Sequence, residues 1–156
     1  MTNLITPCLW FDNQAGEAAT FYTSIFRNSE IETTSYYGKE GVEFHGQPEG
    51  TVLTVVFRIN GQQFTALNGG PLFKFNEAIS FQVFCDTQEE IDHYWEKLTE
   101  GGEEGHCGWL KDKYGVSWQI VPSVLSSLMT NPEKAGKVTN AFMQMKKFDI
   151  EKLLNA

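Results

Sequence analysis

Three rows of side chains, each made of every second residue, mix polar groups with aromatic ones. The rows are Thr6, Cys8 and Trp10; Ser80, Gln82 and Phe84; and Ser117, Gln119 and Val121. In a β-strand alternate residues share a face, so each row would line one side of its strand. Neutral donors and acceptors beside aromatic rings suit an amphipathic organic ligand, and the rows predict a binding pocket. The alternative is a core whose buried polar groups satisfy one another.

Gln119 stands out because it interrupts a short, mostly apolar strand. Residues 111–115 indicate a tight turn, 116–121 a strand, and Pro122 its end. Val116, Trp118 and Ile120 would then share one face, leaving Gln119 on the other with Ser117 and Val121. An amide placed there offers two donor hydrogens and an acceptor to a bound molecule.

Other chemistries find less support among the residues. His45 falls in a polar, Gly-rich stretch, His93 on the polar side of a helix and His106 beside a Gly-rich turn, so no metal site is predicted. The three cysteines have no CxxC spacing and are expected to be inert thiols in a reducing compartment. No phosphate loop, Gly-rich nucleotide turn or Ser-His-Asp arrangement is present, so no cofactor is predicted.

Composition narrows the range of partners. The chain has 156 residues, 41% of them hydrophobic, and a formal net charge of −8 from 20 acidic and 12 basic side chains. This charge repels nucleic acid and anionic membrane surfaces. No secretory signal and no run of roughly 18 apolar residues is seen, so we expect a cytoplasmic protein with no membrane partner.

A repeat organises the chain. The corner Asp12-Asn13-Gln14 recurs as Asp86-Thr87-Gln88, 74 residues later (86 − 12), each time between a strand and a helix. Each half continues with several strands, which predicts a duplicated βαβββ unit whose two sheets pair around a shared interior. The strands are expected at 4–11, 31–37, 51–59, 62–68, 79–85, 107–111 and 116–121. Helices are expected at about 14–26, 87–100, 123–129 and 132–147, with a short one at the end.

Three stretches resemble a known family: FDNQAGEAATFYTSIF (11–26), ALNGGPLFKFNEAISFQVFCDTQEE (66–90) and GGEEGHCGWLKDKYGVSWQIVP (101–122). They are similar to the PhnB-like, or 3-demethylubiquinone 3-methyltransferase-like, branch of the vicinal oxygen chelate superfamily of glyoxalases and bleomycin-resistance proteins. The resemblance implies an α+β fold: one domain over 1–122 made of two βαβββ modules, about 1–70 and 78–122, and a helical extension over 123–156. It also implies a homodimer.

The resemblance assigns positions to a pocket. Metal-using relatives place ligands at positions that fall near Thr6, within 64–68, at Ser80 and at Gln119, and the neutral residues here imply binding without a metal. The expected pocket residues are Thr6, Cys8, Trp10, Phe64, Asn68, Ser80, Gln82, Phe84, Ser117 and Gln119. The expected function is binding of a small organic ligand. The alternatives are an isomerase, lyase or transferase, including the methyltransferase-like activity of the family label, and a metalloenzyme with unrecognised ligands.

Overall fold

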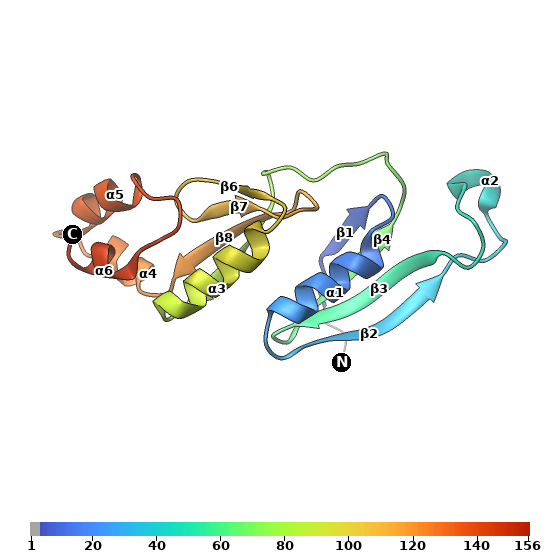
Figure 1. The fold of residues 1–156 in the computed structure, drawn as a ribbon, viewed down its shortest axis with the longest axis horizontal. Coiled ribbons are helices and arrows are strands. Elements are labelled where there is room, and N and C mark those ends of the chain that lie inside the picture. Colours follow the sequence, from blue (N-terminus) through green and yellow to red (C-terminus); the bar gives the residue numbers. More distant parts are fainter. Residues whose placement is uncertain (1–3) are drawn as a thin grey trace. The chain divides into compact units, whose positions relative to one another are not determined.

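The computed structural model describes residues 4–156, which divide into two compact units, one reaching to Lys74 and the other spanning Phe75–Ala156. The first unit contains β1 (Cys8–Phe11), α1 (Ala15–Ile25), β2 (Ser29–Tyr36), α2 (Val42–His45), β3 (Val52–Ile59) and β4 (Gln62–Asn68). Its strands form one sheet in the order β1-β4-β3-β2, with β1 parallel to β4 (Figure 1). The short helix α2 lies in the polar, Gly-rich stretch around His45, where no helix is expected from the sequence.

Aromatic packing joins α1 to this first sheet. Phe57 of β3 lies between Tyr22 of α1 and Phe64 of β4, with ring centroids 6.0 and 5.4 Å apart. All three side chains are buried, and small alanines on α1 allow the helix to approach the strands closely. A tight hairpin joins β3 to β4 at Asn60-Gly61, where both residues have positive φ, 47° and 85°.

The second unit repeats the same strand order. It contains β5 (Ser80–Cys85), α3 (Gln88–Thr99), β6 (Glu103–Glu104), β7 (Trp109–Lys111) and β8 (Ser117–Pro122), ordered β5-β8-β7-β6 with β5 parallel to β8. The expected α+β fold of two βαβββ modules is therefore confirmed, and the two-residue strand β6, which is absent from the expected strands, supplies the fourth strand of the second module. Thr87 and Glu90 form a capping box at the start of α3.

Asp112 fixes the hairpin between β7 and β8. Its carboxylate is buried, and Oδ1 accepts hydrogen bonds from the backbone N–H groups of Tyr114 and Val116 at 2.9 and 3.0 Å. Oδ2 accepts a third bond, from the indole Nε1–H of Trp118 at 2.9 Å. A carboxylate held by three donors locks the turn, and the turn sets the register of β8.

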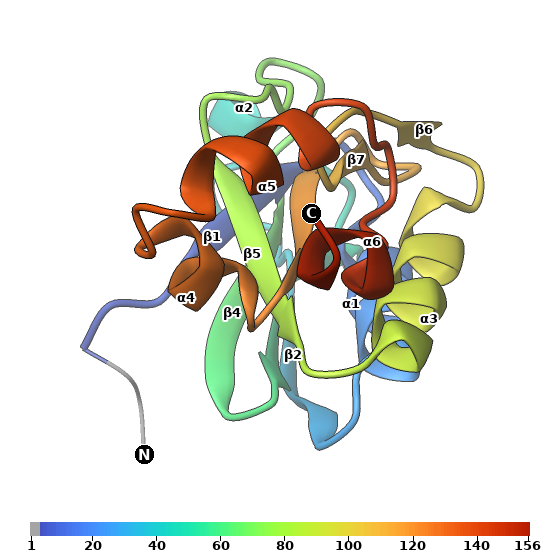
Figure 2. The same cartoon turned by 90° about the vertical axis from the view of Figure 1, so that its left-hand side faces the viewer.

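The C-terminal segment of the second unit forms α4 (Leu125–Met129), α5 (Ala135–Phe142) and α6 (Ile150–Leu154), gathered at one end of the second sheet (Figures 1 and 2). The prediction of one helix over 132–147 is wrong, because α5 ends at Phe142. The carbonyls of Met145 and Lys146 instead accept hydrogen bonds from the N–H groups of Cys107 and Gly108, at 2.9 and 2.8 Å.

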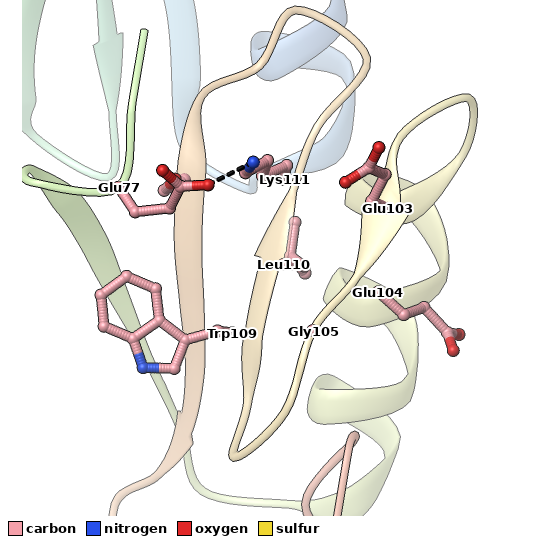
Figure 3. Close-up of a pocket in the computed structure, with 8 residues that line it drawn as sticks. Glu77, Glu103, Glu104, Gly105, Trp109, Leu110 and Lys111 are labelled. Carbon is pink, nitrogen blue, oxygen red and sulfur yellow. Dashed lines mark ion pairs between the residues drawn. The ribbon is translucent and has the colours of Figure 1, made fainter.

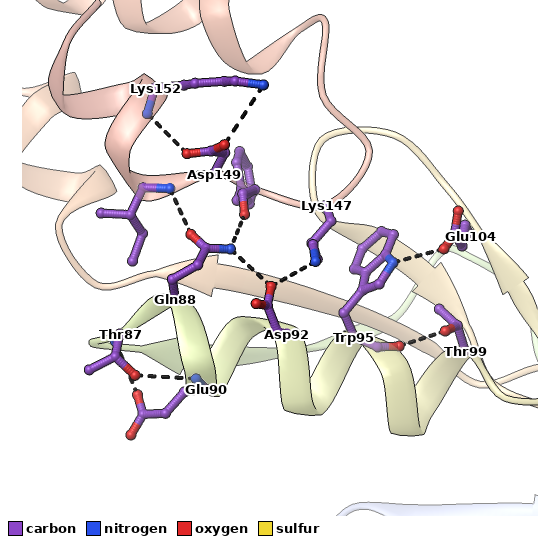
Figure 4. Close-up of polar contacts among 12 residues, drawn as sticks. Thr87, Gln88, Glu90, Asp92, Trp95, Thr99, Glu104, Lys147, Asp149 and Lys152 are labelled. Carbon is purple, nitrogen blue, oxygen red and sulfur yellow. Dashed lines mark hydrogen bonds and ion pairs between the residues drawn. The ribbon is translucent and has the colours of Figure 1, made fainter.

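Gln88 and Asp92 of α3 hold the next part of this segment (Figure 4). The Gln88 amide donates to the carbonyl of Phe148 and accepts from the N–H of Ile150, each at 2.9 Å. Asp92 forms an ion pair with Lys147 at 2.7 Å. Both backbone groups and side chains of the C-terminal segment are thus bonded to α3.

Candidate functional site

The side of each sheet away from its helix carries most of the predicted pocket residues. We call these sides the distal faces of sheet 1 (opposite α1) and sheet 2 (opposite α3). On sheet 2, Leu110, Trp118 and Ile120 are buried and lie on the α3 side, as predicted for Trp118 and Ile120. The distal face carries five predicted residues, namely Ser80, Gln82, Phe84, Ser117 and Gln119.

Gln119 lies at the centre of a polar row on this face. The register pairs Gln82 with Gln119 and Ser80 with Ser117 across β5 and β8. The Gln119 amide Nε2 donates to Ser80 Oγ at 2.8 Å, and Gln82 Nε2 approaches Gln119 Oε1 at 3.5 Å. Gln119 is half-buried and Gln82 exposed, so the row runs from the sheet interior toward solvent.

Ser117 differs from its neighbours on this row. Its residue is only 1% exposed, and among residues 4–156 its Oγ is the one buried side-chain nitrogen or oxygen without a hydrogen-bond partner. Buried hydroxyl groups almost always have a partner. An unpaired hydroxyl on the predicted face is therefore a candidate hydrogen-bonding group for a bound molecule.

A hollow of about 160 Å³ lies beside Ser117. Its walls include Trp109 and Lys111 of β7, Glu103 of β6 and Glu77 from the segment before β5 (Figure 3). Sequence reasoning missed these residues. Two of them could have been found from the hairpin register across the 111–116 turn. Trp109 pairs with Gln119 and Lys111 with Ser117, so Trp109 and Lys111 lie on the distal face.

Charge is concentrated in this hollow. Lys111 and Glu77 form an ion pair, and the hydrogen bond between them raises the pKa of the Lys111 ammonium and lowers the pKa of the Glu77 carboxyl. Glu103 lies opposite Lys111 in the β6–β7 register. Glu104 points the other way, toward α3, where it accepts a hydrogen bond from Trp95 Nε1 at 3.0 Å (Figure 3).

Sheet 1 carries the remaining predicted residues. Cys8 and Trp10 lie on its distal face, and Thr6, just before β1, donates from its hydroxyl to Gln63 Oε1 at 3.1 Å. The Trp10 indole donates to the carbonyl of Gly70 at 2.9 Å, and its ring meets Phe73 edge-on at 4.9 Å. Trp10 thus has structural partners of its own.

Phe64 and Asn68 need correction, because the register of β4 places both on the α1 side of sheet 1. Phe64 belongs to the aromatic stack of the core. The Asn68 amide accepts from the N–H of Ala15, at the start of α1, at 2.8 Å and donates to the carbonyl of Val52 at 3.1 Å. The side chain therefore satisfies helix and sheet backbone, and neither residue faces a ligand on the distal side.

The donor set does not fit the metal that some relatives of this fold bind. Within 64–68, the β4 residues on the distal face are Thr65 and Leu67, which complete a neutral set with Thr6, Ser80 and Gln119. Divalent cations favour imidazole, thiolate or carboxylate ligands, and none stands at these positions. Over residues 4–156, no three His, Cys, Asp or Glu side chains gather as a potential metal group.

Cys8 and Cys85 lie in surroundings that keep their thiols protonated. Burial raises the pKa of the Cys85 thiol to about 12, and desolvation also raises the pKa of Cys8. Both shifts disfavour a reactive thiolate.

His45 is held by local backbone groups. Its Nδ1 accepts from the N–H of Gln47 at 2.9 Å, and its Nε2 lies 3.0 Å from the carbonyl of Glu40. Between residues 4 and 156, no helix has the length and apolar character to span a membrane.

Comparisons with known proteins agree with this architecture. Residues 3–121 match the family model described as 3-demethylubiquinone-9 3-methyltransferase. A PhnB protein from Bacillus cereus is 39% identical, with a TM-score of 0.69, and the match covers 78% of this chain and 100% of that one. A search of curated protein sequences gave no significant match.

Two more distant structures support the fold alone. Protein PA1353 from Pseudomonas aeruginosa is 18% identical with a TM-score of 0.63, covering 78% of this chain and 98% of its own. A variant of the fosfomycin resistance protein FosX from Listeria monocytogenes, in complex with Mn(II) and 1S,2S-dihydroxypropylphosphonic acid, is 20% identical with a TM-score of 0.50, covering 78% and 90%. From the family match and the 39% identity, the chain belongs to the 3-demethylubiquinone-9 3-methyltransferase family, the PhnB-like branch of the vicinal oxygen chelate superfamily.

Proposed function

We propose that this protein binds a small organic molecule, without a metal, on the distal face of sheet 2. The observation that carries the proposal is the unpaired Oγ of Ser117, which lines the hollow beside Trp109 and Lys111. A buried hydroxyl without a partner costs about 1–3 kcal/mol of folding free energy. A ligand atom that hydrogen-bonds to this hydroxyl would recover that free energy on binding.

The neighbouring side chains extend the proposed site. Gln119 and Ser80 already bond to each other at 2.8 Å, and the Gln119 carbonyl oxygen has only a long contact, 3.5 Å, with exposed Gln82. That oxygen is available to accept from a ligand. Phe84 is 62% exposed at the far end of the same row and supplies apolar surface. Polar groups among aromatic surfaces are typical of sites for organic molecules.

The size of the hollow limits what it can hold. Its volume of about 160 Å³ is close to that of the roughly 150 Å³ engineered cavity known to bind benzene in another protein. One six-membered ring or a fragment of similar size would fill it. A larger ligand would extend along the row toward Gln82 and Phe84.

A fragment screen tests the proposal. The ¹⁵N-labelled protein is titrated with ring-sized fragments of positive, neutral and negative charge. The Trp109 indole N–H and the Gln82 and Gln119 side-chain amides serve as reporters. Fragments that bind should shift these signals, with the same affinity before and after chelator treatment. Gln119→Leu should weaken binding by roughly 5- to 100-fold if a ligand group loses its partner.

Gln144→Leu is the matched control, since Gln144 is an exposed glutamine of the C-terminal segment. It should leave the affinities unchanged. If no fragment of any charge perturbs the distal-face signals, the binding proposal is wrong. If binding requires added Mn²⁺, Zn²⁺ or Fe²⁺, the metal-independent part is wrong.

The remaining proposals rest on the family resemblance. We propose a homodimer in the cytoplasm, with residues 1–122 as the ligand-binding domain and 123–156 as its helical extension. Light scattering should give about twice the chain mass of 17.7 kDa. A value equal to the chain mass across micromolar concentrations would contradict the dimer.

A further inference from the structure

The charges around the hollow indicate which ligands it accepts. Its lining brings two carboxylates, Glu77 and Glu103, against one ammonium, Lys111, while the carboxylate of Glu104 is turned toward Trp95 of α3. Lys111 is already paired with Glu77, and Glu103 stands opposite it in the β6–β7 register. The cation is therefore neutralised from within the site, and an excess of negative charge remains.

Trp109 also favours a positively charged ligand, as the carboxylates do. Its indole is half-buried on the distal face, next to Gln119 in the register, and it forms part of the wall. The face of an indole ring attracts ammonium groups through its quadrupole. Figure 3 shows Trp109 and Glu77 on the same side of the strands, away from Glu104.

We propose that the ligand bound at this hollow is a small organic cation, an amine or ammonium carried on a body of about one ring. This inference rests on the proposed binding function and specifies its ligand class. The ammonium lies near Glu103 and Glu77, and the apolar body packs against Trp109. Ser117 Oγ, the unpaired buried hydroxyl of the hollow, accepts a hydrogen bond from the ammonium. Acidic side chains alone would define only a charged surface, and Ser117 is what makes the hollow a binding site.

Three probes of matched size test the charge preference: benzylammonium, benzyl alcohol and benzoate. Each is titrated while the Trp109 indole and the backbone amides of Ser117 and Glu103 are followed by NMR. Benzylammonium should bind about tenfold more tightly than benzyl alcohol, given two nearby carboxylates and an indole. Benzoate should bind most weakly. The advantage of the cation should fall as salt is raised from about 20 to 500 mM, because ions screen exposed charges.

Variants identify the charges responsible. Glu103→Gln should reduce the advantage of benzylammonium over benzyl alcohol by about three- to fivefold while leaving benzyl alcohol unaffected. Glu89→Gln makes the same change in net charge on the exposed first turn of α3 and should have no effect. A melting curve for each variant checks that the fold is retained.

The outcomes separate this inference from the binding proposal. If the fragment screen finds distal-face binders but benzoate or benzyl alcohol equals benzylammonium, the cation inference is overturned and the binding function stands. An equal loss of preference in Glu89→Gln and Glu103→Gln would also overturn it, since only net charge would then matter. If no fragment of any charge reaches the face, both proposals fail.

Discussion

Removing the Ser117 hydroxyl should stabilise the protein, which is the opposite of the usual effect of a mutation in a buried strand. Oγ is buried and unpaired, so Ser117→Ala removes a desolvation cost of about 1–3 kcal/mol. The vacated space is one oxygen atom in size and costs less than about 1 kcal/mol. The net gain is about 0.5–2 kcal/mol, which raises Tm by roughly 2–4 °C per kcal/mol in a chain of this size.

Ser80→Ala is the matched control, since it makes the same chemical change at the register partner of Ser117. The Ser80 hydroxyl accepts from Gln119 Nε2 at 2.8 Å, so its loss leaves a half-buried amide unpaired and should destabilise by about 0.5–1.5 kcal/mol. Urea denaturation of both variants, with unchanged slopes, gives the two free energies. If Ser117→Ala loses as much stability as Ser80→Ala, the hydroxyl has a partner in solution and the reasoning is refuted.

Three other variants test the features that position the site. Gly69→Ala should lose about 1–3 kcal/mol, measured by urea denaturation, because the added Cβ would overlap the Trp10 ring; unchanged stability would show that the ring moves freely. Gln88→Leu should speed hydrogen exchange at the first amide of α6 by tenfold or more, since that N–H loses its acceptor. The ion pair with a lysine and the bond from Gln88 lower the pKa of Asp92. The Asp92 carboxylate therefore stabilises the fold above its unfolded-state pKa, near 3.9. This stabilisation is lost as the pH falls through the lower folded-state pKa. Hydrogen exchange of the C-terminal segment should therefore speed up as the pH falls through this range, and Asp92→Asn should abolish that pH dependence.

The alternation of apolar and polar residues was enough to predict which side chains of β8 face the core. The alternation in β8 placed Trp118 and Ile120 in the core and Gln119 on the other face, as the structure has them. The repeated D-x-Q corner predicted the duplication because each module must turn from a strand into a helix at that point. Short-range signals of this kind depend on residues close in sequence, so one sequence can carry them.

Long-range hydrogen bonds explain the errors. The family resemblance placed Asn68 in the pocket, yet its amide meets the start of α1, 53 residues away in sequence. The helix expected over 132–147 stops at Phe142, and the carbonyls of Met145 and Lys146 beyond it accept hydrogen bonds from the distant turn at 107–108. No local pattern reveals such partners, and tertiary contacts override propensity. Ser117 is the converse case, since the absence of a partner is visible only in three dimensions.

The docking of the C-terminal segment has a practical consequence for anyone shortening this chain. The family match ends at residue 121, which makes the remainder look dispensable. Cutting there would strip the acceptors from the N–H groups of Cys107 and Gly108 and uncover the surface on which buried Phe148 packs over Gly108. The carbonyl of Gly108 in turn accepts a hydrogen bond, at 2.8 Å, from the N–H of Ile120 in the strand that carries Gln119. A shortened form of this protein that keeps the second sheet intact must therefore retain the C-terminal segment through α6.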